Sequence, residues 1–186
     1  MIGRIILVVL AITAIGLPAN GANRCRLSSA DKAANATLSF DDFDQVGALP
    51  STARKLVERG CYDAAVEANE EYLLFGKVMG EGERRVVSFH LGQALALAGR
   101  GREAARVIAG TLKPDQPADA ELDWNTYVKG VWAFLIKDRV RLDAAQRVLS
   151  TLGGNNPINA GALARLQTCF KQSYKAAMND PACAPK

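Results

Sequence analysis

Apolar side chains recur every three or four residues along most of this 186-residue chain, which is the spacing of an α-helix. The clearest example runs from Arg84 to Lys113. Its first half places apolar residues on one helical face, Gly99 and Gly101 mark a turn, and a second apolar face follows. The apolar positions are Val87, Leu91, Ala94, Leu95 and Ala98, then Ala104, Ala105, Ile108 and Leu112. The stretch is therefore predicted to be two helices joined by a tight turn.

The same pattern occurs, less regularly, on either side of this stretch. Gly60 interrupts an earlier apolar pattern, and the run from Gly153 to Pro157 is a strong stop after a later one. Abundant alanine and few β-branched runs also favour helix over strand. The predicted fold is all-α, with antiparallel helical hairpins stacked as a short solenoid. Its parts are an N-terminal arm at 22–49, hairpins at about 50–75, 82–112 and 119–152, a capping helix at 160–178 and a tail at 179–186.

Small residues occur at matching places in the three hairpins. In each one, a small residue in the first helix precedes another in the second helix by twelve positions. The pairs are Ala53 with Ala65, Gly92 with Ala104, and Ala133 with Ala145. Two helices approach closely where both present small side chains, so we expect each pair to be a packing contact.

This arrangement resembles the tetratricopeptide repeat, in which a large residue precedes a glycine in the first helix and an alanine occupies the second. The residues that carry the resemblance are Leu91, Gly92, Leu95, Gly99, Ala104 and Ile108, together with Gly60-x-Tyr62-x-x-Ala65. The resemblance covers residues 50–152 and departs from the family in its period. Ala65 to Ala104 is 39 residues and Ala104 to Ala145 is 41, against 34 in the family. The excess lies in the links near 76–82 and 113–120.

The resemblance implies a concave groove, lined by the first helix of each hairpin, that binds a peptide or a partner protein. Phe89, Tyr127 and Phe134 would hold an apolar anchor, while Gln93 and Lys137 would hold backbone or carboxylate groups. The groove positions that the resemblance assigns are Val86, Phe89, Gln93 and Ala96, then Tyr127, Gly130, Phe134 and Lys137. The alternative is that these aromatic residues cover the N-terminal arm or the C-terminal tail of the same chain.

Residues 1–21 have the composition of a signal peptide. Arg4 gives a positive start, Ile5–Leu17 is an apolar run, and Ala19 and Gly21 supply the small residues that a signal peptidase needs. A retained membrane anchor is the alternative, but this run is shorter than the roughly twenty residues that span a bilayer. The sequence therefore predicts a protein exported to the bacterial periplasm, or secreted, with no stable membrane span after cleavage.

All four cysteines follow the predicted leader, and an even number in an exported chain indicates two disulfides. Three pairings are possible. Cys169 and Cys183 are close in sequence, so the C-terminal tail can fold back on the last helix. Cys25 would then tie the N-terminal arm to Cys61. This pairing is the one that we predict.

Composition argues against several classes of ligand. The net charge is +4 and its charges are interspersed, so no basic patch for nucleic acid stands out. The nearest candidate, Arg100 with Arg102 and Arg106, is more simply a solvated helix face. The chain has one histidine and no C-x-x-C pair, and the acidic run 41–44 lacks the glycine and glutamate of a calcium loop. We predict no metal or other cofactor, and we interpret the acidic run as a polar lead-in to a helix.

No catalytic motif was found. His90 is the only histidine, no G-x-S-x-G sequence accompanies it, and a partly buried structural histidine is expected. The sequence therefore predicts a protein that is not an enzyme but a protein–protein interaction module. The alternative is an accessory enzyme or small-ligand-binding protein of the bacterial cell envelope, with His90 and nearby carboxylates as its chemistry. A purely structural subunit is a third possibility.

Overall fold

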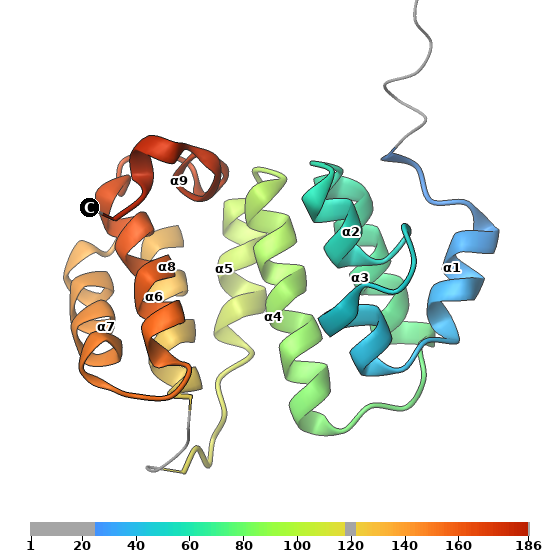
Figure 1. Ribbon diagram of the computed structural model, residues 1–186, viewed down its shortest axis with the longest axis horizontal. Helices are drawn as coiled ribbons and strands as arrows, with labels where there is room; N and C mark the ends of the chain where they lie inside the picture. The colour runs from blue at the N-terminus through green and yellow to red at the C-terminus, as the bar shows by residue number, and fades with distance from the viewer. Residues whose placement is uncertain (1–24, 118–121, 186) are drawn as a thin grey trace, which may run out of the picture.

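The computed structural model describes residues 25–117 and 122–185, and every regular element in those ranges is a helix (Figure 1). In chain order the elements are α1 (Ser29–Ala36), the π-helical turn η2 (Asp41–Val46), α2 (Ala53–Glu58), α3 (Tyr62–Phe75), α4 (Glu81–Leu97), α5 (Gly101–Ala109), α6 (Trp124–Leu135), α7 (Arg139–Thr151), α8 (Asn156–Thr168), α9 (Tyr174–Asn179) and the short 3₁₀ turn η3 (Pro181–Cys183). The all-α prediction is confirmed. The predicted signal peptide lies outside the described residues, and no helix within them has both the length and the apolar character needed to cross a bilayer.

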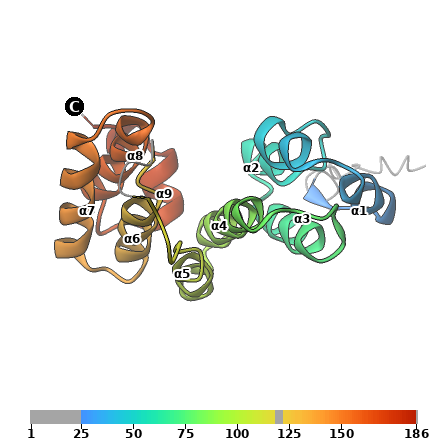
Figure 2. The same cartoon turned by 90° about the horizontal axis from the view of Figure 1, so that it is seen from below.

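Helices that follow one another in sequence pack on one another, so the protein is a stack of helical hairpins. α2 with α3, α4 with α5, and α6 with α7 are the three predicted hairpins, and α8 packs on both helices of the last. Seen from below, the stack is curved, with α2 and α9 on the same inner side and α4 and α5 at the bottom of the curve (Figure 2).

The three hairpin turns share one geometry. Each contains a residue with positive φ: Gly60 at 76°, Gly99 at 83° and Lys137 at 61°. The following residue donates its N–H to a carbonyl five residues back, at 2.8 Å in every case. The three bonds run from Cys61 to Leu56, from Arg100 to Leu95, and from Asp138 to Ala133. This left-handed turn ends many helices, and it favours glycine because a Cβ is strained there.

These turns correct the predicted alignment of the third hairpin. Measured from turn to turn, the repeat is 39 residues and then 38, which is more regular than predicted. Counted back from the turn, Gly130 matches Gly92, three residues earlier than the predicted Ala133. The prediction was wrong because Lys137 stands where the other two turns have glycine, so no sequence signal marks this turn.

Gly92 and Gly130 lie where another helix leaves no room for a side chain. A Cβ on Gly92 would be 2.4 Å from Cγ1 of Ile108 in α5. A Cβ on Gly130 would be 2.4 Å from Cδ1 of Leu163 in α8 and 3.2 Å from the Cβ of Ala145. The predicted close approach of α4 and α5 is present, and in the next hairpin Ala145 of α7 lies close to Gly130 of α6.

Within the described residues, the predicted N-terminal arm contains two helical elements, α1 and η2. α1 begins with a capping box, in which Ser28 and Asp31 each bond the other's backbone N–H. η2 buries Phe43, whose ring stacks on Tyr72 of α3 with centroids 3.8 Å apart. Both elements therefore pack against the first hairpin, α1 on α3 and η2 on α2.

The predicted capping helix at 160–178 is two helices. α8 ends at Thr168, and the side chain of Ser173 caps the start of α9. Between them, Nζ of Lys137 donates to the carbonyls of Phe170 and Gln172 at 2.8 and 2.7 Å. The break lets α9 turn back toward α4, with which it is in contact.

Both predicted disulfides are confirmed. Cys25–Cys61 joins the start of the described chain to the turn between α2 and α3. Cys169–Cys183 joins the end of α8 to η3 and encloses α9 in a loop with a sequence separation of 14. A disulfide therefore cross-links the chain near each end of the stack.

Candidate functional site

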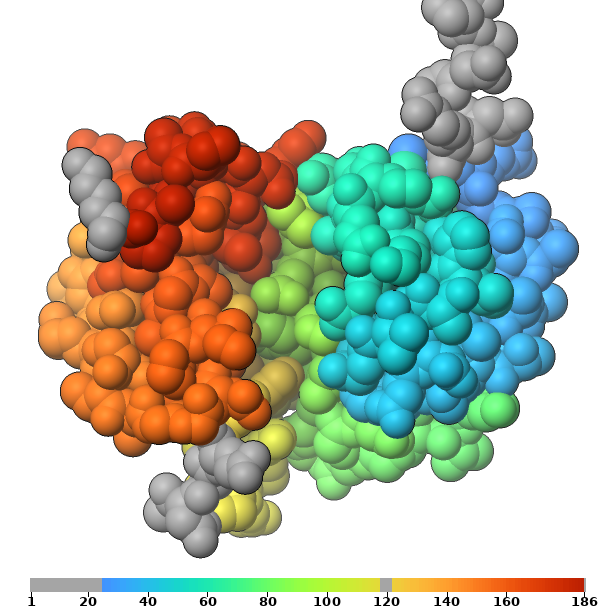
Figure 3. Space-filling model, viewed as in Figure 1, coloured from blue at the N-terminus to red at the C-terminus, as the bar shows by residue number. Residues whose placement is uncertain are grey.

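A groove crosses the concave face of the stack over α4. In the space-filling view it lies between η2 and α2 on one side and the C-terminal helices on the other, with α4 visible at its bottom (Figure 3). It contains a cavity of about 310 Å³, at the lower end of the range for small-ligand sites. The lining residues are Asp44, Ala53, Arg54, Val57, Glu58, Asn69, His90, Gln93, Ala94, Leu97, Tyr174, Met178 and Asn179.

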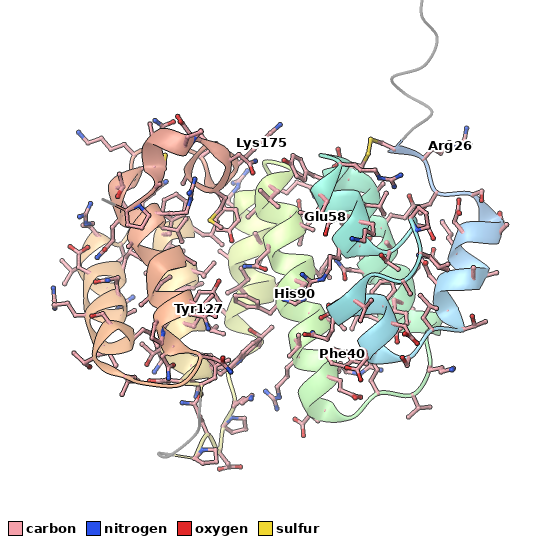
Figure 4. The ribbon with its side chains drawn as sticks, in the orientation of Figure 1. Arg26, Phe40, Glu58, His90, Tyr127 and Lys175 are labelled. Atoms are coloured by element: carbon pink, nitrogen blue, oxygen red, sulfur yellow. A yellow bond between two sulfur atoms is a disulfide. The ribbon has the colours of Figure 1, made fainter. Side chains whose placement is uncertain are left out.

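One wall carries an aspartate–histidine pair. Oδ1 of Asp44, whose side chain is 3 % exposed, lies 2.7 Å from Nδ1 of His90, which is 32 % exposed. Gln45 donates to the other oxygen of Asp44, and Nε of Arg54 donates to its backbone carbonyl at 2.7 Å. The stacking of Phe43 on α3 fixes η2, which places Asp44 beside α4. In Figure 4, His90 lies between Glu58 of α2 and Tyr127 of α6.

The opposite wall is tied to the floor by Gln93. Its Nε2 donates to the hydroxyl of Tyr174 in α9 at 3.2 Å. Burial raises the pKa of Tyr127 to about 12, with a hydrogen bond from Gln93 acting in the opposite direction. Burial also raises the pKa of Tyr174 well above its ordinary value. Both tyrosines stay neutral at physiological pH, and Gln93 links α4 with the C-terminal cap.

Asn69 of α3 provides a buried acceptor without a partner. The residue is 1 % exposed, and its Nδ2 donates to the carbonyl of Ala65 at 3.1 Å. Among the described residues, its Oδ1 is the only buried side-chain nitrogen or oxygen atom that has no hydrogen-bond partner. An unsatisfied buried acceptor costs about 1–3 kcal/mol. Asn69 also lines the cavity, which makes its Oδ1 the candidate acceptor for an N–H or O–H group of a ligand.

The rest of the cavity combines charge at the rim with apolar surface below. Arg54 and Glu58 of α2 are exposed, and Glu58 pairs with Lys55 at 2.9 Å. The apolar part consists of Ala53, Val57, Ala94, Leu97 and Met178. A site of this composition suits a ligand with an apolar group and several polar atoms.

The residues predicted to bind a partner lie mostly beneath this surface. Phe89 is 1 % exposed, with its ring centroid 5.1 Å from that of Trp124 and 5.4 Å from that of Tyr127. Tyr127 is itself 9 % exposed. Val86 is partly buried and packs against the core. Of the predicted set, Gln93 is the one that lines the cavity.

At the C-terminal end, the predicted residues contact the chain itself. Phe134 is buried, with ring centroids of Phe170 and Tyr174 each 6.0 Å away. Nζ of Lys137 lies 3.9 Å from the ring centroid of Phe134, and burial lowers the pKa of this lysine. Phe134 and Lys137 therefore contact the segment between α8 and α9. This agrees with the alternative in which these residues are covered by the C-terminal part of the same chain.

Asp44, Arg54 and Asn69 were not predicted from the sequence as site residues. Asp44 belongs to the acidic run that we interpreted as a polar lead-in, and it is separated from His90 by 46 residues. No spacing rule connects two such positions. The expected partly buried, structural histidine is consistent with the geometry of His90.

The chemistry available in the cavity is limited. An aspartate bonded to one imidazole nitrogen orients the ring and leaves the other nitrogen for proton transfer or ligand contact. Among the described residues, the cavity lining includes no serine, threonine or cysteine nucleophile, and no group of His, Cys, Asp and Glu has the arrangement of a metal site. The side chains that the lining does offer for polar contacts include one oriented imidazole, the carboxylates of Asp44 and Glu58, and the guanidinium of Arg54.

Searches against protein-family models, curated proteins and solved structures found no match for this chain.

Proposed function

We propose that this protein is an exported, tetratricopeptide-repeat-like interaction module that binds a segment of a partner polypeptide in the groove over α4. The observation that carries the proposal is the unpaired Oδ1 of Asn69 in the lining of a cavity that also contains charged and apolar side chains. Curved stacks of helical hairpins expose concave surfaces of this kind, on which such repeats bind their partners.

A polypeptide segment supplies the groups that the cavity lacks. Each non-proline residue carries one N–H donor and one C=O acceptor. An N–H of the segment pairs with Oδ1 of Asn69, and the exposed guanidinium of Arg54 meets a carbonyl or carboxylate. Val57, Leu97 and Met178 receive an apolar side chain. The cavity volume of about 310 Å³ restricts this contact to one or two residues of the segment.

Export is part of the same proposal. Two disulfides within the described residues fit an oxidising compartment. We propose that residues 1–21 are removed and that the protein works in the periplasm or outside the cell. Mass spectrometry of the mature protein checks this, because an N-terminus that retains Met1 contradicts it.

Site-specific photo-crosslinking in the native compartment tests the binding function. A photoreactive residue replaces Glu58, which lines the cavity and has a side chain 53 % exposed. The matched control carries the same probe at Val78, which is fully exposed in the loop before α4. We expect a discrete protein adduct from position 58 that is lost with Asn69→Leu, and none from position 78. Equal adducts from both positions contradict the proposal.

The Asp44–His90 pair favours one second candidate, an accessory enzyme that uses His90 as a general base on a bound envelope component. His90→Gln keeps a polar side chain of similar reach but cannot transfer a proton at neutral pH. If this variant still crosslinks but no longer performs the protein's function in cells, as judged by complementation of a deletion strain, the enzyme is supported. Retention of both supports the interaction module.

A further inference from the structure

A second groove lies on the outer face of the stack, away from α2 and α9. It runs over α6, between α5 and α7, and Figure 2 shows these two helices on either side of α6. One hollow of about 630 Å³ lies over the N-terminal part of α6, and another of about 1090 Å³ continues toward the turn after α6. The two share Ala109 and Trp132 in their lining, so they form one continuous surface.

The floor of this outer groove is apolar. Leu112, Val128 and Val148 line its first part, and Leu135 and Ile136 line its second. Val148 and Ile136 are 45 % and 43 % exposed, and within the described part of the chain the groove stays open. Trp132, at the junction, is half-buried. An apolar recess that is partly exposed in this way is typical of an interaction site.

The rim of the outer groove is basic. Its charged lining residues are Arg100, Arg102, Glu103, Arg106, Lys129 and Arg141. The one acid, Glu103, is paired with Arg100 at 2.7 Å. Arg141 lies over the ring of Trp132, with its Cζ 5.5 Å from the centroid, and pairs with Asp138 at 3.4 Å. Arg102 and Arg106 are exposed and have no ion pair within the described residues. The surplus positive charge requires a partner with carboxylates beside its apolar contacts.

We infer that the outer groove binds an acidic amphipathic helix of a partner protein. The lining residues of α6 and its C-cap extend from Thr126 to Ile136, which is about 15 Å at 1.5 Å per residue. A helix laid along α6 therefore contacts it over about three turns. Its apolar residues at intervals of three and four meet Trp132, Leu135 and Val148, while its flanking carboxylates meet Arg102 and Arg106.

The shape of the surface excludes a bilayer as the preferred occupant. A membrane-binding surface presents apolar residues on a protruding face, whereas these residues lie in a recess between α5 and α7. A helix fits such a recess because its side chains project into it. This inference does not depend on the proposed function, because the two grooves lie on opposite faces of the stack.

Binding of designed peptides tests the inference. The probe is a fluorescently labelled helical peptide of about 14 residues, three to four turns, with leucines on one face and glutamates beside them. One control peptide has lysine for every glutamate, and another has alanine for every leucine. We expect the acidic peptide alone to bind, with an affinity that falls as salt rises, and with a blue shift of Trp132 emission that Trp132→Phe abolishes. Equal binding of the acidic and lysine peptides overturns the inference, as does full binding of the alanine peptide.

Charge reversal on the protein provides the matched comparison. Arg102→Glu with Arg106→Glu should weaken binding of the acidic peptide about tenfold or more, because the rim charges then repel it. Arg26→Glu with Lys77→Glu changes the net charge equally at exposed positions outside the groove, and it should leave binding unchanged. An equal loss in both double variants overturns the inference.

Two further measurements separate other occupants. Sedimentation velocity of the protein alone should give one species, and self-association that Arg102→Glu with Arg106→Glu removes would assign the groove to a second copy. Cosedimentation with anionic phosphatidylglycerol vesicles should not depend on these arginines. Vesicle binding that they control, without peptide binding, overturns the inference in favour of a membrane.

Discussion

Oδ1 of Asp44 and Nδ1 of His90 are 2.7 Å apart, which joins the N-terminal π-helical turn to the central helix of the stack. The carboxylate is almost fully buried, so the imidazole replaces water as its partner. This contact places residues 41–46 at the edge of the concave groove, where they form part of its wall.

Replacing Asp44 should loosen that wall. Asp44→Ala removes a buried carboxylate together with its hydrogen bonds to His90 and Gln45, so we expect a loss of about 1–3 kcal/mol in the free energy of unfolding. Urea denaturation followed by circular dichroism measures it. Asp41→Ala, at an exposed position of the same turn, is the control and should change stability by less than about 0.5 kcal/mol. Similar losses in the two variants would show that the buried pair does not support η2.

Replacing Gly92 or Gly82 with alanine, both in α4, should change the stability of the protein in opposite directions. A Cβ at position 92 meets Ile108 at 2.4 Å, so Gly92→Ala should destabilise the protein by about 1–3 kcal/mol through overpacking. At position 82, in the first turn of α4, a Cβ meets nothing within 4 Å. Gly82→Ala should therefore stabilise the protein by up to about 1 kcal/mol. Thermal unfolding of both variants checks the pair, and a stable Gly92→Ala variant would contradict the close approach of α4 and α5.

Because Tyr127 and Tyr174 are buried, we expect the protein to lose stability at alkaline pH. The pKa of Tyr127 is raised from 10.0 in the unfolded chain to about 12 in the folded protein. This contribution to stability is complete below pH 10, and it is lost as pH rises toward about 12 because only the unfolded chain ionises readily.

Tyrosinate absorbance and circular dichroism, recorded together between neutral and strongly alkaline pH, check this prediction. We expect ionisation of the buried tyrosines to coincide with unfolding. Tyr127→Phe should move the alkaline unfolding midpoint upward relative to Tyr62→Phe, whose ring is only partly buried. If all tyrosines ionise while the protein is still folded, Tyr127 and Tyr174 are not buried as described, and the prediction is contradicted.

The second disulfide should matter most for α9. Cys169→Ser with Cys183→Ser opens a loop whose closure is worth about 3 kcal/mol in the chain-entropy model. We expect faster hydrogen exchange in α9 and η3 and little change in α3 to α5. Cys25→Ser with Cys61→Ser is the complementary variant and should affect α1 and η2 instead. A uniform increase in exchange along the whole chain would contradict this local assignment.

Local pattern was enough to predict most of the stack. The hairpins follow from apolar spacing and from Gly60 and Gly99, because helix periodicity and left-handed caps act within a few residues. The third turn was misplaced in the predicted alignment because its residue with positive φ is Lys137. The other two turns have a glycine there, and a lysine at this position gives no sequence signal for a turn. The contacts of Lys137 with Phe170 and Gln172, which lie more than 30 residues away, accompany its positive φ.

The site depends on contacts between residues far apart in sequence, and that is why its residues were not predicted. His90 and Asp44 meet because Phe43 stacks on Tyr72, and Gln93 meets Tyr174 because the chain breaks after α8. Neither event has a local signature. Phe89 and Phe134 were expected at the groove surface, and neighbouring aromatic rings cover both.

Tyr174, Met178 and Asn179 form one side of the cavity, and all three belong to α9. α9 lies inside the loop that the Cys169–Cys183 disulfide closes. A ribosome that has made every helix up to α8 has therefore produced the floor and one wall of the groove, but not its other wall. Because α9 follows α8 in the chain, a nascent chain that ends at α8 lacks the wall formed by Tyr174, Met178 and Asn179.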